Sequence, residues 1–231
     1  MGKFFDMESP FMRFLNRVAD LLILNLLMII CCIPVITIGA AFTGMHYVLI
    51  KIVRGEEGYL FKGFFKSFVR NFKQATILWL LMLIVLAVYI GDFMIFSYSG
   101  LKFPTPLVIA VLAIAVFIMM VAMYIFPLLA RFDNTIKNTI KNAFFIAVLN
   151  LPKTLIMVIV GIIPVAILYF WSYGAIFVMM FGISLPAYIT ACLYSEIFRK
   201  FEPEEDKPVS DYDFSIEVSE EQDDNKSQEI E

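Results

Sequence analysis

The fold of this 231-residue chain is decided by its first uncharged stretch, LLILNLLMIICCIPVITIGAAFTGMHYVLI at Leu21–Ile50, which runs for 30 residues without Asp, Glu, Lys or Arg. A helix needs about 20 residues to cross a hydrocarbon core of about 30 Å. The stretch is therefore longer than one crossing and shorter than two. The segment Ile33–Gly39 contains a proline and ends in glycine. We expect the chain to break there into two helices, at about residues 12–33 and 38–53; one tilted or kinked helix is the alternative.

Three further uncharged runs follow, at residues 74–91, 103–130 and 154–195. The last run is long enough for two crossings, with a break predicted at the aromatic cluster and glycine of Tyr169–Gly174. Of all residues, 61% are hydrophobic and only 17% are charged, and the mean hydropathy is +0.83. This composition excludes an ordinary soluble domain and indicates an integral membrane protein.

The distribution of charge predicts the topology. Residues 51–73 hold six basic and two acidic side chains, and residues 131–153 hold four basic side chains and one acid. By the positive-inside rule, both segments and both termini should be cytoplasmic. Crossings must then come in pairs, which predicts an all-α polytopic bundle of three helical hairpins with six spans. Five spans would result if the first run formed a single helix.

Two basic segments have the spacing of amphipathic helices. In residues 59–73, basic side chains recur at intervals of three and four, with phenylalanines on the other faces, and residues 136–144 follow a similar pattern. We expect these helices to lie at the inner leaflet, with aromatic rings in the acyl boundary and ammonium groups near anionic lipid. Lipid, rather than nucleic acid, is thus the expected partner. Two units of basic helix followed by a hairpin also suggest an internal repeat.

The end of the chain differs from the body. Residues 202–231 carry thirteen acids and two lysines, a net charge of −11, whereas residues 1–201 carry sixteen basic and eight acidic side chains, a net charge of +8. The acidic stretch cannot bury enough apolar area to offset its chain entropy. We therefore expect a membrane domain at residues 1–201 and a disordered cytoplasmic tail at residues 202–231.

No constellation for catalysis is visible. Glycine-rich phosphate loops, zinc-protease motifs and nucleophile elbows are missing from the sequence, which has one histidine and three cysteines, all in apolar runs. We expect no enzymatic activity, no cofactor and no metal site. An ionisable residue within a span is costly enough to indicate function, and Asp92, about eighteen residues into its span, is the best candidate of this kind. Asn25 and His46 are expected to face a shared interior of the first hairpin, where a hydrogen bond between helices is the simpler role.

Irregular backbone offers a second kind of candidate. The Pro34–Gly39 break and the sequence Gly182–Pro186 could build a substrate site of a transporter, because discontinuous helices often do so. Packing kinks are the simpler interpretation, since proline and glycine are common in membrane helices.

The order of several short blocks resembles the YesL-like family of bacterial multi-pass membrane proteins, a domain of unknown function. The residues that carry it are Phe14, Asn16 and Asp20 leading to Asn25–Leu27, then Pro34–Ala40, Glu57–Tyr59, Phe64–Phe68, Asn71–Thr76, Arg131–Asn134, Lys141–Ala143 and Asn150–Leu155.

The resemblance implies a bacterial plasma-membrane protein whose gene neighbours encode carbohydrate ABC importers and glycan-degrading enzymes. It implies no established reaction, and family descriptions often suggest five spans. The expected function is therefore accessory to or regulatory of a carbohydrate import system, with the importer's permease as partner; a small-solute transporter is the alternative. The candidate functional or interface residues are Asn25, Pro34, Thr37, Gly39, His46, Asn71, Lys73, Asp92, Arg131, Asn134, Asn150 and Lys153.

Overall fold

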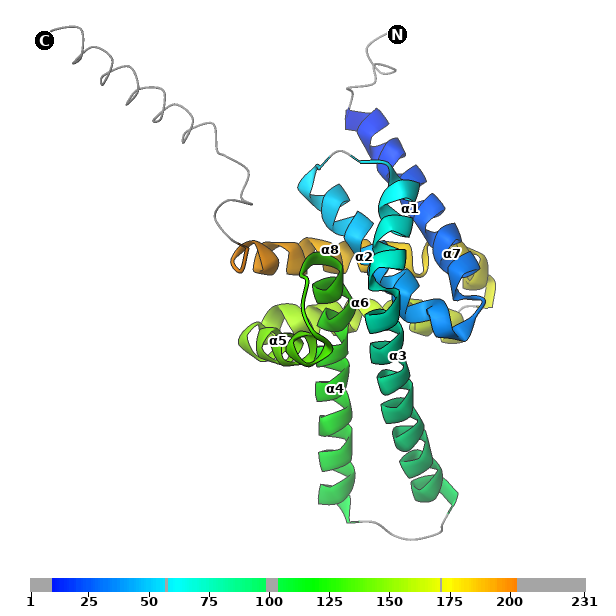
Figure 1. The fold of residues 1–231 in the computed structure, drawn as a ribbon. Coiled ribbons are helices and arrows are strands. Elements are labelled where there is room, and N and C mark those ends of the chain that lie inside the picture. Colours follow the sequence, from blue (N-terminus) through cyan, green and yellow to red (C-terminus); the bar gives the residue numbers. More distant parts are fainter. Residues whose placement is uncertain (1–9, 57, 99–103, 171, 203–231) are drawn as a thin grey trace, which may run out of the picture. The chain divides into compact units, whose positions relative to one another are not determined.

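The computed structural model describes residues 10–56, 58–98, 104–170 and 172–202, and all regular secondary structure in this part of the chain is helical (Figure 1). This confirms the all-α prediction. The elements are α1 (Pro10–Cys32), η2 (Val35–Thr37), α2 (Ile38–Arg54), α3 (Leu60–Tyr98), α4 (Thr105–Arg131), α5 (Ile136–Leu149), α6 (Leu151–Phe170), η3 (Ser172–Gly174), α7 (Ala175–Phe181) and α8 (Ser184–Arg199).

The chain divides into two compact units, residues 1–195 and 196–231. The described part of the second unit is the last turn of α8 and the residues up to Glu202. The acidic stretch at residues 203–231, predicted to be disordered, lies outside the described residues. The boundary between a membrane domain and a tail at residue 201 therefore stays a prediction.

The first uncharged run forms two helices, as predicted. Helix α1 ends at Cys32, the short 3-10 turn η2 follows, and α2 begins at Ile38. The Thr37 hydroxyl lies 2.5 Å from the Cys31 carbonyl oxygen and 2.7 Å from that of Pro34, so it can donate to either of these carbonyls where the helix ends. The alternative of one kinked helix over this run is wrong.

Five helices of the described chain are long and apolar enough to cross a membrane: α1, α2 with its preceding turn, α3, α4 and α6. Helices α7 and α8 pass the same test only together, and they are bent by 49° at their junction. The protein is therefore polytopic. Whether it has five or six spans depends on this bent pair and not, as the sequence indicated, on the first run.

The basic segment at residues 59–73 was predicted to be a separate surface helix, and that prediction is wrong. It forms the beginning of α3, which continues without interruption for 39 residues (Figure 1). Phe64 is fully buried, with its ring against Gly44 of α2, and so does not enter the acyl boundary. The basic segment is consequently a rigid extension of a membrane-length helix.

Helix α5, the second predicted amphipathic helix, is a separate element. Its N-terminus is capped by the Thr135 hydroxyl, which accepts from the backbone N–H of Asn138 at 3.4 Å. Asn150 ends the helix before α6 begins. The two basic units therefore differ in construction, since only the second is divided from its span.

Helix α2 lies at the centre of the packing because its inner face is built from small residues. Gly39, Ala40, Ala41, Thr43 and Gly44 are all buried. Small side chains let helix backbones approach closely in a membrane protein. Helix α3 packs along this face, and α4 lies beside both α2 and α3.

The topology can be tested by cysteine labelling in intact cells. In a background without native cysteines, we expect reporters at Pro104 and Tyr173 to react with an impermeant maleimide, whereas reporters at Tyr59, Lys137 and Lys200 should not, because cationic segments remain on the cytoplasmic side. Labelling of the Lys200 reporter would show that α7 and α8 turn back instead of crossing together. Labelling of the Tyr59 reporter would contradict the positive-inside assignment itself.

Candidate functional site

The connection between α2 and α3 reverses the chain within a few residues. Gly55, directly after α2, has φ 71°, a left-handed conformation that glycine adopts without steric cost. The Gly55 N–H donates to the Ile52 carbonyl at 3.3 Å, and the Glu56 N–H donates to the Lys51 carbonyl at 3.0 Å. This closure directs α3 back along α2, so the last turns of α2 face the first turns of α3.

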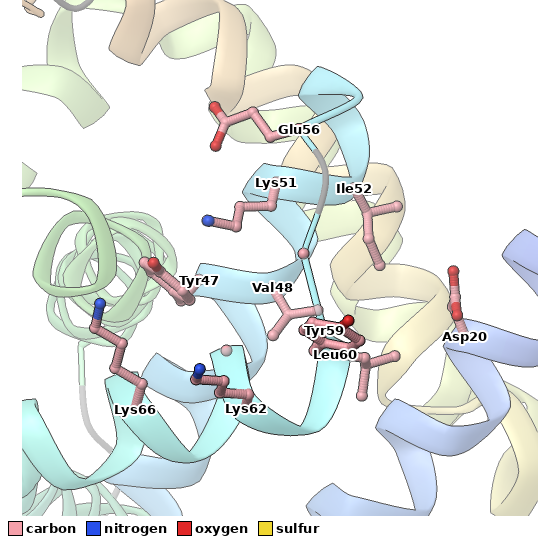
Figure 2. Close-up of a pocket in the computed structure, with 12 residues that line it drawn as sticks. Asp20, Tyr47, Val48, Lys51, Ile52, Glu56, Tyr59, Leu60, Lys62 and Lys66 are labelled. Carbon is pink, nitrogen blue, oxygen red and sulfur yellow. The ribbon is translucent and has the colours of Figure 1, made fainter.

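A cleft of about 430 Å³ lies at this reversal (Figure 2). Tyr47 and Lys51 are one helical turn apart on α2, and Lys62 and Lys66 are one turn apart on α3, so each pair shares a face of its helix. The lining residues are Asp20, Tyr47, Val48, Lys51, Ile52, Glu56, Gly58, Tyr59, Leu60, Lys62, Gly63 and Lys66.

The cleft brings together three ammonium groups that form no ion pair with any described residue. Lys51 Nζ lies 5.4 Å from the centroid of the Tyr47 ring, and Figure 2 shows Lys62 and Lys66 on the same side as this pair. Of the acids in the lining, Glu56 faces Arg54 at 4.0 Å, and Asp20 lies on the opposite side of the cleft. Positive charge gathered in this way can bind an anion.

A second polar arrangement surrounds the junction of α7 and α8. The side-chain nitrogen of Asn25 donates to the Met179 carbonyl at 2.8 Å, and its side-chain oxygen accepts from the N–H groups of Ile183 and Ser184, both at 3.1 Å. In an unbroken helix the Ile183 N–H would donate to the Met179 carbonyl four residues earlier. The Asn25 amide is thus inserted into that hydrogen bond, a recognised cause of a helix kink.

The surroundings of this junction are apolar. A cavity of about 70 Å³ beside it is lined by aliphatic, aromatic, proline and glycine residues of α6, α7 and α8, including Pro164, Phe181 and Pro186. The Ser184 hydroxyl is buried and has no hydrogen-bond partner among the described residues. The cavity supplies no further polar groups to orient a substrate.

His46 also connects the first hairpin with the last helix. It is buried, and its Nδ1 lies 2.9 Å from the hydroxyl of Tyr194. Near the end of α2, Arg54 Nε donates to the Ser195 hydroxyl at 3.2 Å. Asn25 and His46 were predicted to face a shared interior of the first hairpin, with a hydrogen bond between helices as the simpler role. Each does form hydrogen bonds between helices, and the partners lie on the C-terminal helices α7 and α8.

The Pro34–Gly39 corner packs against α3. The Trp79 indole N–H donates to the Val35 carbonyl at 2.9 Å, and a Cβ placed on Gly39 would come within 2.4 Å of the Ala75 carbonyl oxygen. The corner is thus a tight contact between helices, with a backbone carbonyl bonded to the neighbouring helix α3. None of the described cavities is lined by this corner.

The remaining candidates are dispersed. Asn71 is buried, and its amide donates to the Ser67 carbonyl one turn earlier in α3, at 3.1 Å. Lys73 is exposed close to it, whereas Asp92 lies towards the other end of α3. The structure therefore does not bring these three residues into one site.

The candidates from the fourth helix onwards mark helix ends. Arg131 is the last residue of α4, Asn134 lies in the connection to α5, and Lys153 is in the first turn of α6. Asn150 donates from its side chain to the Ile146 carbonyl at 3.1 Å, and its own carbonyl accepts from Thr154 at 2.9 Å. The Thr154 hydroxyl also lies 2.9 Å from that of Tyr124, so this group joins α4, α5 and α6.

Sequence reasoning did not select Lys51, Tyr47 or Asp20 as site residues. The available signals were the four-residue spacing of Tyr47 and Lys51 and the glycine at residue 55 after a basic helix end. Their meaning depended on the direction in which α3 leaves the turn, which the sequence pattern did not specify.

Comparison with known protein families gives a match to part of the chain. The model of a family described as protein of unknown function, DUF624, matches residues 21–93, from within α1 to near the end of α3. No curated protein and no solved structure matches the chain. The chain is thus similar, over the segment that contains Asn25, the Pro34–Gly39 corner and every α2 and α3 residue of the cleft, to a family whose function is unknown.

Proposed function

We propose that this chain is an accessory or regulatory membrane protein of a carbohydrate ABC importer, without enzymatic activity of its own, located in a bacterial plasma membrane. The observation that carries the proposal is the continuity of α3. Its first turns present exposed basic side chains, at Lys62, Lys66, Arg70 and Lys73, and the same helix continues into an apolar segment of membrane length.

This construction suits docking to a membrane partner. Because Phe64 and Asn71 are buried, the rotation of the segment about its helix axis is fixed and the basic side chains are held on an exposed face. A fixed row of charges can guide a partner into one orientation through electrostatic complementarity. The importer as partner is supported by the resemblance to the YesL-like family, whose genes accompany such systems.

The proposal is tested by co-purification with the permease. We expect replacement of Lys62, Lys66, Arg70 and Lys73 by glutamine to reduce the permease recovered with the protein at least about tenfold, because charge complementarity across the interface is lost. Lys137→Gln with Lys141→Gln on α5 is the control and should leave recovery unchanged. Undiminished recovery with the fourfold variant would exclude docking through α3.

A small-solute transporter is the second candidate, and the broken α7–α8 pair favours it. Half-helices that meet within a membrane are a common construction of transporter sites. Sugar uptake by vesicles that contain this chain alone would support the transporter, whereas uptake that requires the importer would support the accessory role.

A further inference from the structure

We propose that the cleft between α2 and α3 is a binding site for a phosphorylated polyol, a phosphate group carried on a body with free hydroxyls. Two sources have this chemistry: the glycerophosphate headgroup of an anionic lipid and a soluble sugar or glycerol phosphate. The cleft shares Lys62 and Lys66 with the row of basic residues proposed for permease docking. The two inferences can still be distinguished, because Lys51 and Tyr47 belong only to the cleft while Arg70 and Lys73 lie outside it.

Charge is the first argument. The ammonium groups of Lys51, Lys62 and Lys66 lie on one side of the cleft and have no ion-pair partner among the described residues (Figure 2). Like charges held together repel one another, and an anion between them relieves that repulsion. Lysine commonly binds phosphate in this way, as a point charge with rotatable donors.

The backbone adds to this positive field. Leu60 and Gly63 of the cleft belong to the first turn of α3, which contains no acidic residue. The N-terminus of a helix carries partial positive charge, which disfavours a lysine such as Lys62 unless an anion is near. The contribution is the field of the helix end, since the Gly63 N–H itself donates to the Tyr59 carbonyl at 2.8 Å. The N-terminus of α3 and the lysines therefore both favour an anionic ligand.

The volume of the cleft and the residues across from the lysines indicate what kind of group is attached to the phosphate. A volume of about 430 Å³ falls within the range of small-molecule sites and leaves room for a body attached to the phosphate. Asp20 and Glu56 line the cleft as well, and Figure 2 shows Asp20 across from the lysines. Carboxylates accept hydrogen bonds from hydroxyl groups. A polyol end facing Asp20 and a phosphate facing the lysines match this distribution of charge.

Binding is measured on the full chain purified in neutral detergent, with calorimetric titration of glycerol 3-phosphate, glucose 6-phosphate and inorganic phosphate. The lipid arm uses nanodiscs of phosphatidylcholine with and without phosphatidylglycerol, and native mass spectrometry records the lipid that remains bound. Saturable binding of an organic phosphate would identify a soluble ligand. Retention of phosphatidylglycerol over phosphatidylcholine, without soluble binding, would identify the lipid headgroup.

In either arm, Lys51→Gln and Lys62→Gln should each weaken binding about tenfold or more, as expected for a hydrogen bond to a charged group. Arg70→Gln with Lys73→Gln removes two charges from the same helix outside the cleft and should leave binding unchanged. An equal loss in this control, or no binding in either arm, would overturn the assignment. Inorganic phosphate bound as tightly as glucose 6-phosphate would overturn the polyol part.

The two proposals fail separately. If Lys51→Gln abolishes binding of the phosphate compound but the permease still co-purifies, the docking proposal stands. If Arg70→Gln with Lys73→Gln abolishes co-purification of the permease but the phosphate compound still binds, the cleft proposal stands.

Discussion

Replacement of Asn25 by leucine is expected to lower the free energy of unfolding by about 1–3 kcal/mol and to reduce the 49° bend between α7 and α8. Leucine has nearly the same volume but cannot bond the Met179 carbonyl or the N–H groups of Ile183 and Ser184. Unsatisfied backbone groups are costly inside a membrane protein. Part of that cost can be recovered if the Ile183 N–H bonds directly to the Met179 carbonyl, which would straighten the pair.

Two measurements on the purified protein separate these effects. Unfolding by a denaturing detergent in mixed micelles reports the stability, and the distance between spin labels at Ile176 and Ile189, both exposed, reports the bend. Asn138→Leu is the matched control, because Asn138 is also an amide in a helix but is exposed on α5. We expect the control to change neither quantity.

A wild-type label distance together with wild-type stability in Asn25→Leu would contradict the inserted amide. It would mean that the bend is set by Gly182 and Pro186 alone. Loss of stability with an unchanged bend would instead show that Asn25 bonds the free backbone groups at the break but does not cause the break.

The sequence predicted the helical class and most of the helix limits well, because these depend on local features. Pro34 and Gly39 placed the first break, and Gly174 the break before α7. Proline restricts φ and has no N–H donor, so a break at Pro34 can be predicted from neighbouring residues alone.

Features that depend on distant contacts were not predictable. The segment at residues 59–73 has the spacing of a surface helix, and periodicity alone does not show that Phe64 packs under Gly44 or that the helix continues into the span. Asn25 was recognised as a polar residue within a span, but its partners lie more than 150 residues away. The cleft likewise depends on two helices meeting at Gly55.

Gly39→Ala is expected to destabilise the protein by about 1–3 kcal/mol, the usual cost of overpacking a tight contact. A Cβ at this position would lie 2.4 Å from the Ala75 carbonyl oxygen and 2.8 Å from Trp79 Cβ, and backbone cannot rotate away as a flexible side chain can. Helix α2 must therefore move from α3. The same movement should stretch the hydrogen bond from the Trp79 indole to the Val35 carbonyl and alter tryptophan fluorescence.

Gly91→Ala provides the control, because the substitution is identical and Gly91 lies in α3 with no atom within 4 Å of the added Cβ. Alanine favours a helix over glycine by up to about 1 kcal/mol, so this variant should be as stable as the wild type or more stable. A lower free energy of unfolding for Gly39→Ala, with an unchanged or higher value for Gly91→Ala, would show that the Pro34–Gly39 corner packs tightly against α3. A Gly39→Ala protein as stable as the wild type would mean that the corner does not pack tightly against α3. That result would support the other interpretation, in which the irregular backbone of this break surrounds a transported solute.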